Sequence, residues 1–428
     1  MSDAFLGIDC GTGKVAVAIV DAHGRQLHAA SSPHGADLPT TAGRHEQDAE
    51  RIIATAEALV RDIPADLRAR IAGIGFTGQM HGVVLHDATS KPLSPLVTWQ
   101  DKRAVEDPAF LPSLGRPLNT GFGMATLAWW ARRNEIPAVA RASTIHGLLA
   151  ARWGALDRAP IDPTDAAAWG GLAEIPGVNA KVLPTAVGHG AVIGLLTPVS
   201  ANDLGLNAGI TLHAPLGDNQ ASIRATLHDA AHDLGFTLGT GCQLAAVVPR
   251  SQMIALGHAE RRPYDSQHDL FVAAPLCGGA AWRWLAETAA SWIVDLGRPA
   301  PPLDVMYARL DELGLAADDA LTFAPHLLGE RHDGALTGTL AGLRLGNGSL
   351  GQIARAVARG ISANARDLLP TVVRQGRTRV VASGNALRRS TLLRTMAEQE
   401  LGIPLVLSDR SEEAATGAAL VAAGTPRR

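Results

Sequence analysis

The sequence contains few cysteines, no long apolar segment and little net charge. Its cysteines, Cys10, Cys242 and Cys277, lie too far apart in 428 residues to suggest a disulfide framework or a zinc site. No apolar run approaches the roughly 18 residues that a membrane-spanning helix needs, and the first residues lack the basic region of a signal peptide. The net charge of −3 indicates neither a nucleic-acid nor a membrane-surface partner. We therefore expect a cytoplasmic protein.

The remaining composition is that of a large globular protein. Hydrophobic residues make up 46% of the chain and charged residues 18%. This balance supports large buried cores and argues against disorder. The length is enough for roughly two or three domains.

The two halves of the chain each open with a similar glycine-containing segment. Residues 7–20 read GIDCGTGKVAVAIV, residues 235–248 read GFTLGTGCQLAAVV, and six of the fourteen positions match. In both copies apolar residues precede and follow Gly-Thr-Gly, which predicts a strand, a tight turn and a second strand. We place the domain boundary just before the second copy, which gives domains of residues 1–232 and 233–428.

Helical and strand patterns alternate in both halves, which predicts an α/β fold of two mixed sheets covered by helices. The segments expected to be helical are 46–62, 124–133, 141–153, 219–231, 279–296, 350–370 and 386–401. The further segments expected to be strands are 26–30, 71–75, 245–248, 379–382 and 404–407.

Residues 11–16 also satisfy a dinucleotide-binding pattern, GxGxxA. That pattern functions only where it opens a helix within a βαβ unit. Here an alternating strand pattern follows, which argues against a dinucleotide site. A P-loop is excluded as well, because Val15 stands where Ser or Thr is required.

The two glycine turns are candidates for binding phosphate. A glycine-rich hairpin allows main-chain N–H groups to approach phosphate oxygens, and a threonine adds a hydroxyl donor. Asp9 precedes the first turn, where it is either an ordinary turn carboxylate or a ligand of Mg²⁺. The residues proposed for the turns are Gly11, Thr12, Gly13, Gly239 and Thr240.

Asp218 has two interpretations. It follows Gly217 and directly precedes a predicted helix, which is typical of an N-cap that accepts hydrogen bonds from the first N–H groups. It is equally a candidate general base that removes the proton of a sugar hydroxyl attacking phosphorus. The two roles are compatible.

Three further segments carry polar residues next to predicted strands. Gly78-Gln-Met-His-Gly82 ends an apolar strand, as ligand sites of open α/β sheets do. Trp99-Gln-Asp-Lys-Arg103 offers an aromatic face beside charged groups, which suits a polyol or a surface turn. Ser383-Gly384-Asn385 links a strand to a helix and is either a common turn or the wall of an adenosine pocket.

Together these segments resemble the FGGY carbohydrate kinases of the actin-like ATPase superfamily, over essentially the whole chain. The matching elements are Gly7-Ile-Asp-Cys-Gly-Thr, Gly78-Gln-Met-His-Gly, Trp99-Gln-Asp-Lys-Arg, Gly217-Asp-Asn-Gln-Ala, Leu238-Gly-Thr-Gly, Gly329-Glu-Arg, Gly384-Asn-Ala and Glu413-Ala-Ala-Thr-Gly-Ala-Ala. Within the family, residues 96–103 and 120–126 look most like sedoheptulokinases, and the Gln-Met-His-Gly element also resembles xylulokinases.

The resemblance implies two ribonuclease-H-like lobes with a cleft between them, and transfer of the ATP γ-phosphate to a sugar with Mg²⁺. It implies an N-terminal lobe that carries the sugar site and the catalytic base, and a C-terminal nucleotide-binding lobe. Asp218 falls on the family's base, Asp9 on the metal-associated carboxylate, and the two glycine turns on its phosphate motifs. Gly384 and Asn385 fall on the adenosine motif. The residues that fall on the sugar site are Gln79, Met80, His81, Trp99, Asp101 and Asn219.

We predict phosphorylation of the terminal hydroxyl of a ketose, with sedoheptulose the preferred substrate. The alternatives are another pentulose or polyol kinase, such as a xylulokinase, and a non-catalytic nucleotide-binding sugar sensor. The sequence departs from the family at Gly13-Lys14 and at Gly241-Cys242, where small hydroxyl residues are common. The chain is also short for the family, with the missing length expected in the second lobe. A homodimer is the assembly that we consider.

Overall fold

The computed structural model describes residues 3–424, and these pack as two compact units. The first unit contains residues 3–225, 263–266 and 410–424, and the second contains 226–262 and 267–409. The predicted boundary between 232 and 233 lies seven residues after the break at 225–226, and the segment 410–424 with the last helix of the described chain belongs to the first unit.

A mixed seven-stranded sheet forms the centre of the first unit, in the order β11-β12-β5-β1-β2-β3 with β13 also paired to β5. β1 runs antiparallel to β2 and parallel to β5, and β5 runs parallel to β12 and β13. The strands are β1 (Ala4–Cys10), β2 (Lys14–Asp21), β3 (Gln26–Pro33), β5 (Ile71–Gly78), β11 (Val192–Leu195), β12 (Thr211–His213) and β13 (Leu216–Gly217).

Helices and short two-stranded ladders complete this unit. The ladders pair β4 (Glu46–Gln47) with β7 (Leu96–Val97), β6 (Val84–His86) with β8 (Arg141–Ser143), and β9 (Pro160–Ile161) with β10 (Thr185–Ala186). The helices are α1 (Ala49–Arg61), α2 (Ala65–Arg68), η1 (Arg103–Val105), α3 (Phe110–Ser113), α4 (Gly123–Arg132), α5 (Ile145–Gly154), α6 (Pro163–Ala168), η2 (Ala180–Val182), α7 (Pro198–Leu204), α8 (Asp218–Thr226) and α15 (Glu413–Ala422).

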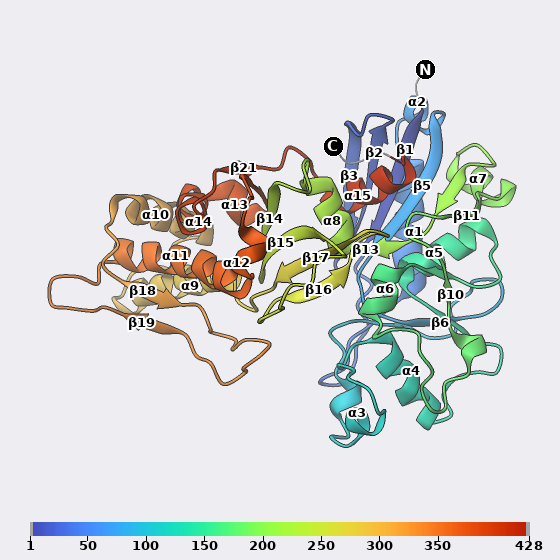
Figure 1. The fold of residues 1–428 in the computed structure, drawn as a ribbon, viewed down its shortest axis with the longest axis horizontal. Helices are drawn as coiled ribbons and strands as arrows, with labels where there is room; N and C mark the ends of the chain where they lie inside the picture. The colour runs from blue at the N-terminus through green and yellow to red at the C-terminus, as the bar shows by residue number, and fades with distance from the viewer. Residues whose placement is uncertain (1–2, 425–428) are drawn as a thin grey trace. The chain divides into compact units, whose positions relative to one another are not determined.

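Helix α15 packs against the central sheet and α8 through small residues (Figure 1). A Cβ atom at Gly7 of β1 would lie 1.9 Å from the Ala415 carbonyl oxygen, and one at Gly75 of β5 only 2.1 Å from that of Ala418. These separations are shorter than any contact of a real Cβ. The helix therefore approaches the strands at a distance that only glycine permits.

The second unit is built on a six-stranded sheet in the order β16-β17-β15-β14-β20-β21 and one further ladder, β18–β19. Its strands are β14 (Asp233–Leu238), β15 (Cys242–Pro249), β16 (Glu260–Pro263), β17 (His268–Ala273), β18 (Thr322–Ala324), β19 (Thr339–Ala341), β20 (Arg379–Ser383) and β21 (Leu405–Leu407). Its helices are α9 (Gly279–Asp295), α10 (Leu303–Ala316), α11 (Leu350–Leu368), α12 (Thr371–Arg374), α13 (Asn385–Arg389) and α14 (Thr391–Leu401).

Helix α11 shows how local sequence and packing agree in this unit. Ser349 and Gln352 form a capping box, which satisfies main-chain donors at the start of the helix. The buried face of the helix, which includes Val357 and Ile361, belongs to the same apolar core as the strands β14, β15 and β20. The capping box and the buried apolar face therefore both favour a helix at these residues.

The duplicated hairpin is confirmed. Residues 11–13 join the antiparallel strands β1 and β2, and residues 239–241 join the antiparallel strands β14 and β15. Because a strand follows the first turn, the GxGxxA match opens no helix, as expected. The α/β class with two mixed sheets is confirmed as well.

Four predicted helices have different limits. In the segment 46–62, residues 46–47 form β4, and α1 begins after Asp48, whose carboxylate accepts a hydrogen bond from the Arg51 N–H. Residues 141–143 form β8, and α5 begins after Thr144, whose hydroxyl accepts a hydrogen bond from the Gly147 N–H. The segment 386–401 is two helices, because Ser390 ends the first and caps the second. Helix α8 ends at Thr226, and the Asp233 carboxylate accepts hydrogen bonds from the main chain that follows.

Each helix within residues 3–424 is too short or too polar to traverse a lipid bilayer.

Candidate active site

The first glycine turn lies at the carboxyl end of β1 and is accessible to solvent. Gly11 and Thr12 are partly exposed and Gly13 is exposed. The Thr12 hydroxyl accepts a hydrogen bond of 3.0 Å from the indole of Trp99, and its carbonyl accepts one of 2.7 Å from the side chain of Gln47. The turn is therefore fixed from two sides while its outer face stays open.

Asp9 and Asp218 come from neighbouring strand ends. Asp9 pairs with Thr77 of β5, and on the other side of β5 Leu216 pairs with the same residue. Asp218 follows two residues later as the first residue of α8, so its carboxylate lies in the first helical turn. Such a position favours negative charge, and both residues are only partly exposed.

The two carboxylates influence each other. The pKa of Asp9 is raised from 3.8 to about 7. Burial is the largest cause, and the negative charge of the Asp218 carboxylate is the next. His146 and Lys14 act in the opposite direction. The Oδ1 atom of Asp9 is buried and has no hydrogen-bond partner. A buried carboxylate oxygen next to a second carboxylate is an arrangement that a hard divalent cation would stabilise.

No cluster of three metal-ligating side chains occurs in the described part of the chain. Mg²⁺ in phosphoryl-transfer sites typically uses one or two carboxylates together with substrate phosphates and water. The donor set formed by Asp9 and Asp218 therefore fits Mg²⁺ without a third side chain.

Lys14 forms an ion pair close to the turn. Its Nζ lies 2.7 and 2.6 Å from the two carboxylate oxygens of Glu412, which immediately precedes α15. The Ser31 hydroxyl donates to the same carboxylate. The Lys14 ammonium group is thus directed to a carboxylate of its own unit.

Residues 79–81 follow β5 and are held tightly. The Gln79 main-chain N–H donates to the Cys10 carbonyl at 3.0 Å, and its side chain donates to Gln47 at 2.9 Å. Met80 is buried against Gly217, where an added Cβ would lie 2.7 Å from the methionine Cε. This segment therefore contacts both β1 and the residue before Asp218.

His81 adopts a left-handed main-chain conformation, with a φ of 75°. Such a conformation is unusual for a residue with a side chain and is held by its surroundings. The ring is stacked on Phe122 with centroids 4.8 Å apart, and its Nδ1 lies 2.5 Å from the Ala168 carbonyl. The orientation of His81 is therefore fixed before any ligand binds.

Trp99 and Asp101 differ in accessibility although they are close in sequence. Trp99 is 49% exposed, so about half of its surface is available for contact. Asp101 is buried, and its carboxylate accepts hydrogen bonds from the Arg103 side chain and from the main-chain N–H groups of Arg103 and His45. The Asp101 carboxylate oxygens therefore stabilise the turn formed by residues 99–103. Asn219 follows Asp218 in α8 and is partly exposed.

The sequence analysis missed a buried pair next to these residues. His146 of α5 and Asp165 of α6 are completely buried, and their Nε2 and Oδ2 atoms are 2.6 Å apart. The available signal was a polar residue within the apolar run Ile145–Leu149. A histidine within an apolar helix is usually structural, and only its spatial neighbours distinguish it.

In the second unit, the second glycine turn contacts the start of α9. The Gly239 carbonyl accepts a hydrogen bond of 2.9 Å from Gly279 N–H, and the Thr240 carbonyl accepts from the N–H groups of Gly278 and Ala280. Gly384 has a φ of 97°, and an added Cβ would lie 2.5 Å from the Leu238 carbonyl oxygen. Strand β14, its turn and the Gly384 turn are therefore packed together.

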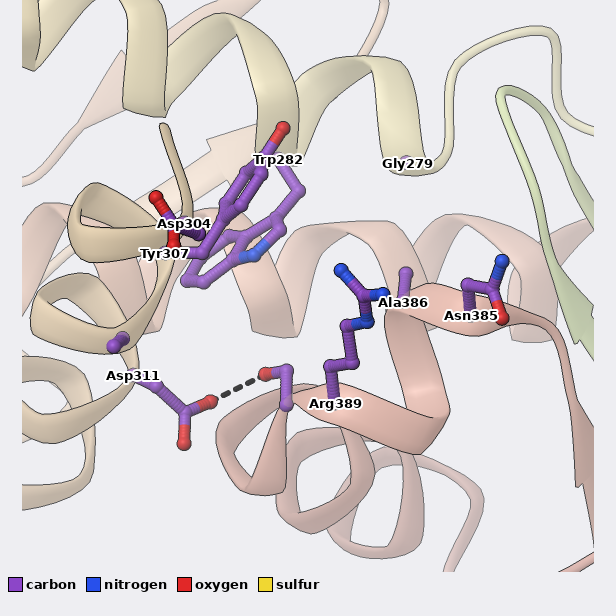
Figure 2. A pocket seen from close by; sticks show the side chains of 10 residues that line it. Gly279, Trp282, Asp304, Tyr307, Asp311, Asn385, Ala386 and Arg389 are labelled. Atoms are coloured by element: carbon purple, nitrogen blue, oxygen red, sulfur yellow. Dashed lines mark hydrogen bonds between the residues drawn. The ribbon is translucent and has the colours of Figure 1, made fainter. Parts of the chain in front are cut away.

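A cavity of about 470 Å³ lies beside these turns, which is within the usual range for a small-molecule site. Figure 2 shows the aromatic side chains of Trp282 and Tyr307 next to each other, with Asp304 nearby, and Arg389 projecting toward the same space. Asp311 accepts a hydrogen bond from the Ser390 hydroxyl at the edge. The lining residues are Gly279, Trp282, Asp304, Tyr307, Ala308, Asp311, Asn385, Ala386, Arg389 and Ser390.

Of the predicted site residues, the structure brings several of those in the first unit into contact with the two strand ends or with the glycine turn. Trp99 contacts Thr12, Gln79 contacts Cys10 next to Asp9, and Met80 contacts Gly217 next to Asp218. In the second unit Gly239, Thr240 and Gly384 pack together, and Asn385 lines the cavity.

The architecture of two mixed α/β units is shared with solved sugar-kinase structures. A xylulose kinase from Rhodospirillum rubrum superposes with a TM-score of 0.83 at 22% identity, covering 98% of this chain and 89% of that one. A glycerol kinase from Plasmodium falciparum, solved with ADP, gives a TM-score of 0.79 at 18% identity, covering 99% and 90%.

Sequence comparison defines the family. Residues 4–135 match the N-terminal domain, and residues 234–425 the C-terminal domain, of the FGGY family of carbohydrate kinases. Human sedoheptulokinase is 30% identical over 97% of this chain and 96% of its own length. The chain belongs to the FGGY family and is a carbohydrate kinase.

Proposed function

We propose that this protein transfers the γ-phosphate of ATP to the terminal hydroxyl of a ketose, with sedoheptulose as preferred substrate and sedoheptulose 7-phosphate as product. The choice of sedoheptulose as substrate is supported by the similarity to human sedoheptulokinase over nearly the full length of both chains. The observation that supports the chemistry is the pair of carboxylates Asp9 and Asp218 beside an exposed glycine turn.

In this proposal Asp218 is the general base. It accepts the proton of the sugar hydroxyl as the oxygen–phosphorus bond forms and the bond from the γ-phosphorus to ADP breaks. The partly exposed position in the first turn of α8 favours the ionised carboxylate, since the helix N-terminus stabilises negative charge. A base with these properties is available to a bound hydroxyl.

The sugar is bound by the segments that contact the two strand ends. The exposed indole of Trp99 provides an apolar platform, and the fixed ring of His81 and the side chains of Gln79 and Asn219 provide polar contacts. Asp101 contributes indirectly, because its carboxylate holds the turn that carries Trp99.

Each glycine turn by itself offers main-chain N–H groups and a threonine hydroxyl as donors to phosphate oxygens of ATP. Asp9 and Asp218 would hold Mg²⁺, which when bound neutralises charge on the phosphate oxygens. The cavity lined by Trp282, Tyr307 and Asn385 receives the adenosine. The ADP bound to the Plasmodium relative supports a nucleotide as ligand.

The test is ADP release measured with sedoheptulose, D-xylulose, D-ribulose and glycerol, and without sugar. We expect the highest kcat/KM for sedoheptulose and negligible release without an acceptor. A preference for xylulose would contradict the proposed substrate but leave the proposed kinase activity intact. ADP release that no sugar stimulates would favour the nucleotide-binding sensor and overturn the proposed reaction.

A further inference from the structure

A second cavity, of about 560 Å³, lies in the first unit and is lined by none of the residues proposed above for sugar or phosphate. It lies beside the ladder of β6 and β8, at the end of β6 that is farther along the chain from residues 79–82. Its volume is within the usual range for a small-molecule site. The reaction proposed above gives this cavity no role.

Three of the residues that line the cavity are cationic. Arg141 is the first residue of β8, Arg158 lies between α5 and β9, and Lys181 belongs to η2. The fold thus brings cationic residues from three separate segments of the chain to one cavity. Such a convergence of positive charge favours an anionic ligand.

One acidic residue, Asp87, lines the same cavity. Its Oδ1 atom accepts hydrogen bonds of 2.8 and 3.0 Å from the N–H groups of Thr89 and Lys91, and one of 2.7 Å from the Thr89 hydroxyl. The Asp87 carboxylate therefore stabilises the turn formed by residues 87–91.

The three cationic residues differ in the partners that they have. The Nη2 atom of Arg141 lies 2.6 Å from Oδ1 of Asp157, an exposed residue outside the cavity lining. Within residues 3–424, no carboxylate forms an ion pair with Arg158 or Lys181. These two positive charges are therefore available to a ligand, and they match a ligand with two negative charges.

The main chain next to both of these residues is held by hydrogen bonds. The Ala159 carbonyl, adjacent to Arg158, accepts a hydrogen bond of 2.9 Å from the Thr185 N–H. The Asn179 side chain accepts one of 2.9 Å from the Lys181 N–H. The segments that carry the two cations are thus positioned before any ligand binds.

Another part of the lining is apolar. It includes residues 138–140, whose sequence is Ala-Val-Ala, and the side chain of Val139 is 66% exposed. A ligand with carbon atoms beside its charged group would cover this apolar surface, whereas free inorganic phosphate would leave it exposed to water. The cavity therefore combines positive charge with an apolar wall.

We propose that this cavity binds a small phosphate monoester, with the phosphate between Arg158 and Lys181 and the carbon skeleton against residues 138–140. A phosphate monoester carries a charge of about −1.5 to −2 at pH 7. Hydrogen bonds from guanidinium and ammonium groups to phosphate are among the strong ones. This inference does not depend on the proposed reaction, and it adds a second ligand site to the first unit.

The test is a methyl NMR titration of the wild-type protein, isotopically labelled at valine, with D-fructose 6-phosphate, D-fructose and inorganic phosphate. The Val139 signal reports on the cavity and is assigned by its absence from Val139→Ala. Val199, which is 73% exposed in the same unit and outside this lining, is the control signal.

We expect D-fructose 6-phosphate to shift the Val139 signal saturably, with a Kd below about 1 mM, and to leave the Val199 signal in place. D-Fructose should shift neither signal. Inorganic phosphate should bind about tenfold more weakly than the ester, because it leaves the apolar wall uncovered.

Substitutions connect the shift to the two cations. Arg158→Gln and Lys181→Gln should each weaken binding of D-fructose 6-phosphate at least about tenfold, because each removes a charged donor. Both side chains are at least partly exposed, so both variants should fold. Arg25→Gln is the matched control, since it removes one charge from an exposed arginine of the same unit outside the cavity. It should leave the affinity unchanged.

An unmoved Val139 signal would overturn the inference, as would equal weakening by Arg158→Gln and Arg25→Gln, which would indicate general attraction to positive charge. Equal affinities for inorganic phosphate and the ester would overturn the assignment of a monoester. None of these measurements requires turnover, so each outcome leaves the proposed kinase reaction intact.

Discussion

The indole N–H of Trp99 donates a 3.0 Å hydrogen bond to the hydroxyl of Thr12, which joins the proposed sugar platform to the first phosphate turn. Both residues are at least partly exposed. The residue proposed for the sugar and the turn proposed for phosphate therefore share a direct side-chain contact.

Trp99→Ala should raise the KM for sugar about tenfold, because an exposed aromatic platform contributes roughly 0.5–1.5 kcal/mol or somewhat more to binding. Trp99→Phe retains the aromatic face and should stay within a few-fold. Steady-state kinetics at saturating ATP measure both. The matched control is Trp292→Ala on α9, since Trp292 is also 49% exposed. Equal effects of Trp99→Ala and Trp292→Ala would rule out the platform.

Asp218→Asn should lower kcat by about 10²–10⁴-fold, because a positioned general base contributes that much. Asparagine preserves size and polarity at the start of α8, so the melting temperature and both affinities should change little. Asp66→Asn, an exposed acidic residue in the first turn of α2, is the control. Near-normal turnover from a folded Asp218→Asn protein would mean that the base lies elsewhere.

Asp9→Asn should change stability in a pH-dependent way. The carboxyl group has an ordinary pKa of 3.8 and a folded-state pKa of about 7. The folded protein therefore binds this proton more tightly, and the associated stability is complete below 3.8 and lost as pH rises through 7. Without Mg²⁺, the variant should equal wild type at low pH and exceed it at pH 8 by on the order of 1–3 kcal/mol.

Thermal melts of both proteins at several pH values measure this difference. Added Mg²⁺ should stabilise the wild type more than Asp9→Asn, because a ligand that binds the folded state shifts the equilibrium toward it. Asp295→Asn, at the exposed end of α9, should show neither effect. A constant offset across the pH range would contradict the buried-carboxylate explanation.

Ala308→Trp should block the cavity of the second unit, because Ala308 lines it and tryptophan would occupy its volume. We expect the KM for ATP to rise at least about tenfold while the KM for sugar stays within a few-fold. Ala316→Trp adds the same side chain to the exposed end of the same helix, outside the lining residues. ATP binding unaffected by Ala308→Trp would place the adenosine in another pocket.

The sequence predicted those features that depend on local pattern. The two hairpins around Gly-Thr-Gly were predictable because alternating apolar residues and glycine determine a strand–turn–strand locally. The limits of α5 and α14 were not, because they depend on the caps formed by Thr144 and Ser390 within otherwise helical patterns.

Features that depend on tertiary neighbours could not be predicted. Asp101 and His146 are both polar residues in the sequence. Nothing local reveals that the Asp101 carboxylate accepts a hydrogen bond from the distant His45 N–H, or that carboxylates surround His146. Whether Lys14 points to Glu412 likewise depends on a partner 398 residues away. The predicted roles of the site residues remain predictions, and the experiments above test them.

The close packing of α15 has a consequence for how the chain is made. The glycines of β1 and β5 are covered by a helix that is synthesised after residues 226–409, and Gly417 of that helix contacts α8, where an added Cβ would lie 1.8 Å from the Ala221 carbonyl oxygen. On the ribosome, the first unit emerges early but lacks this covering helix throughout translation of the second. Its sheet can therefore acquire its final packing only late in synthesis, which couples maturation of the base-bearing unit to completion of the other.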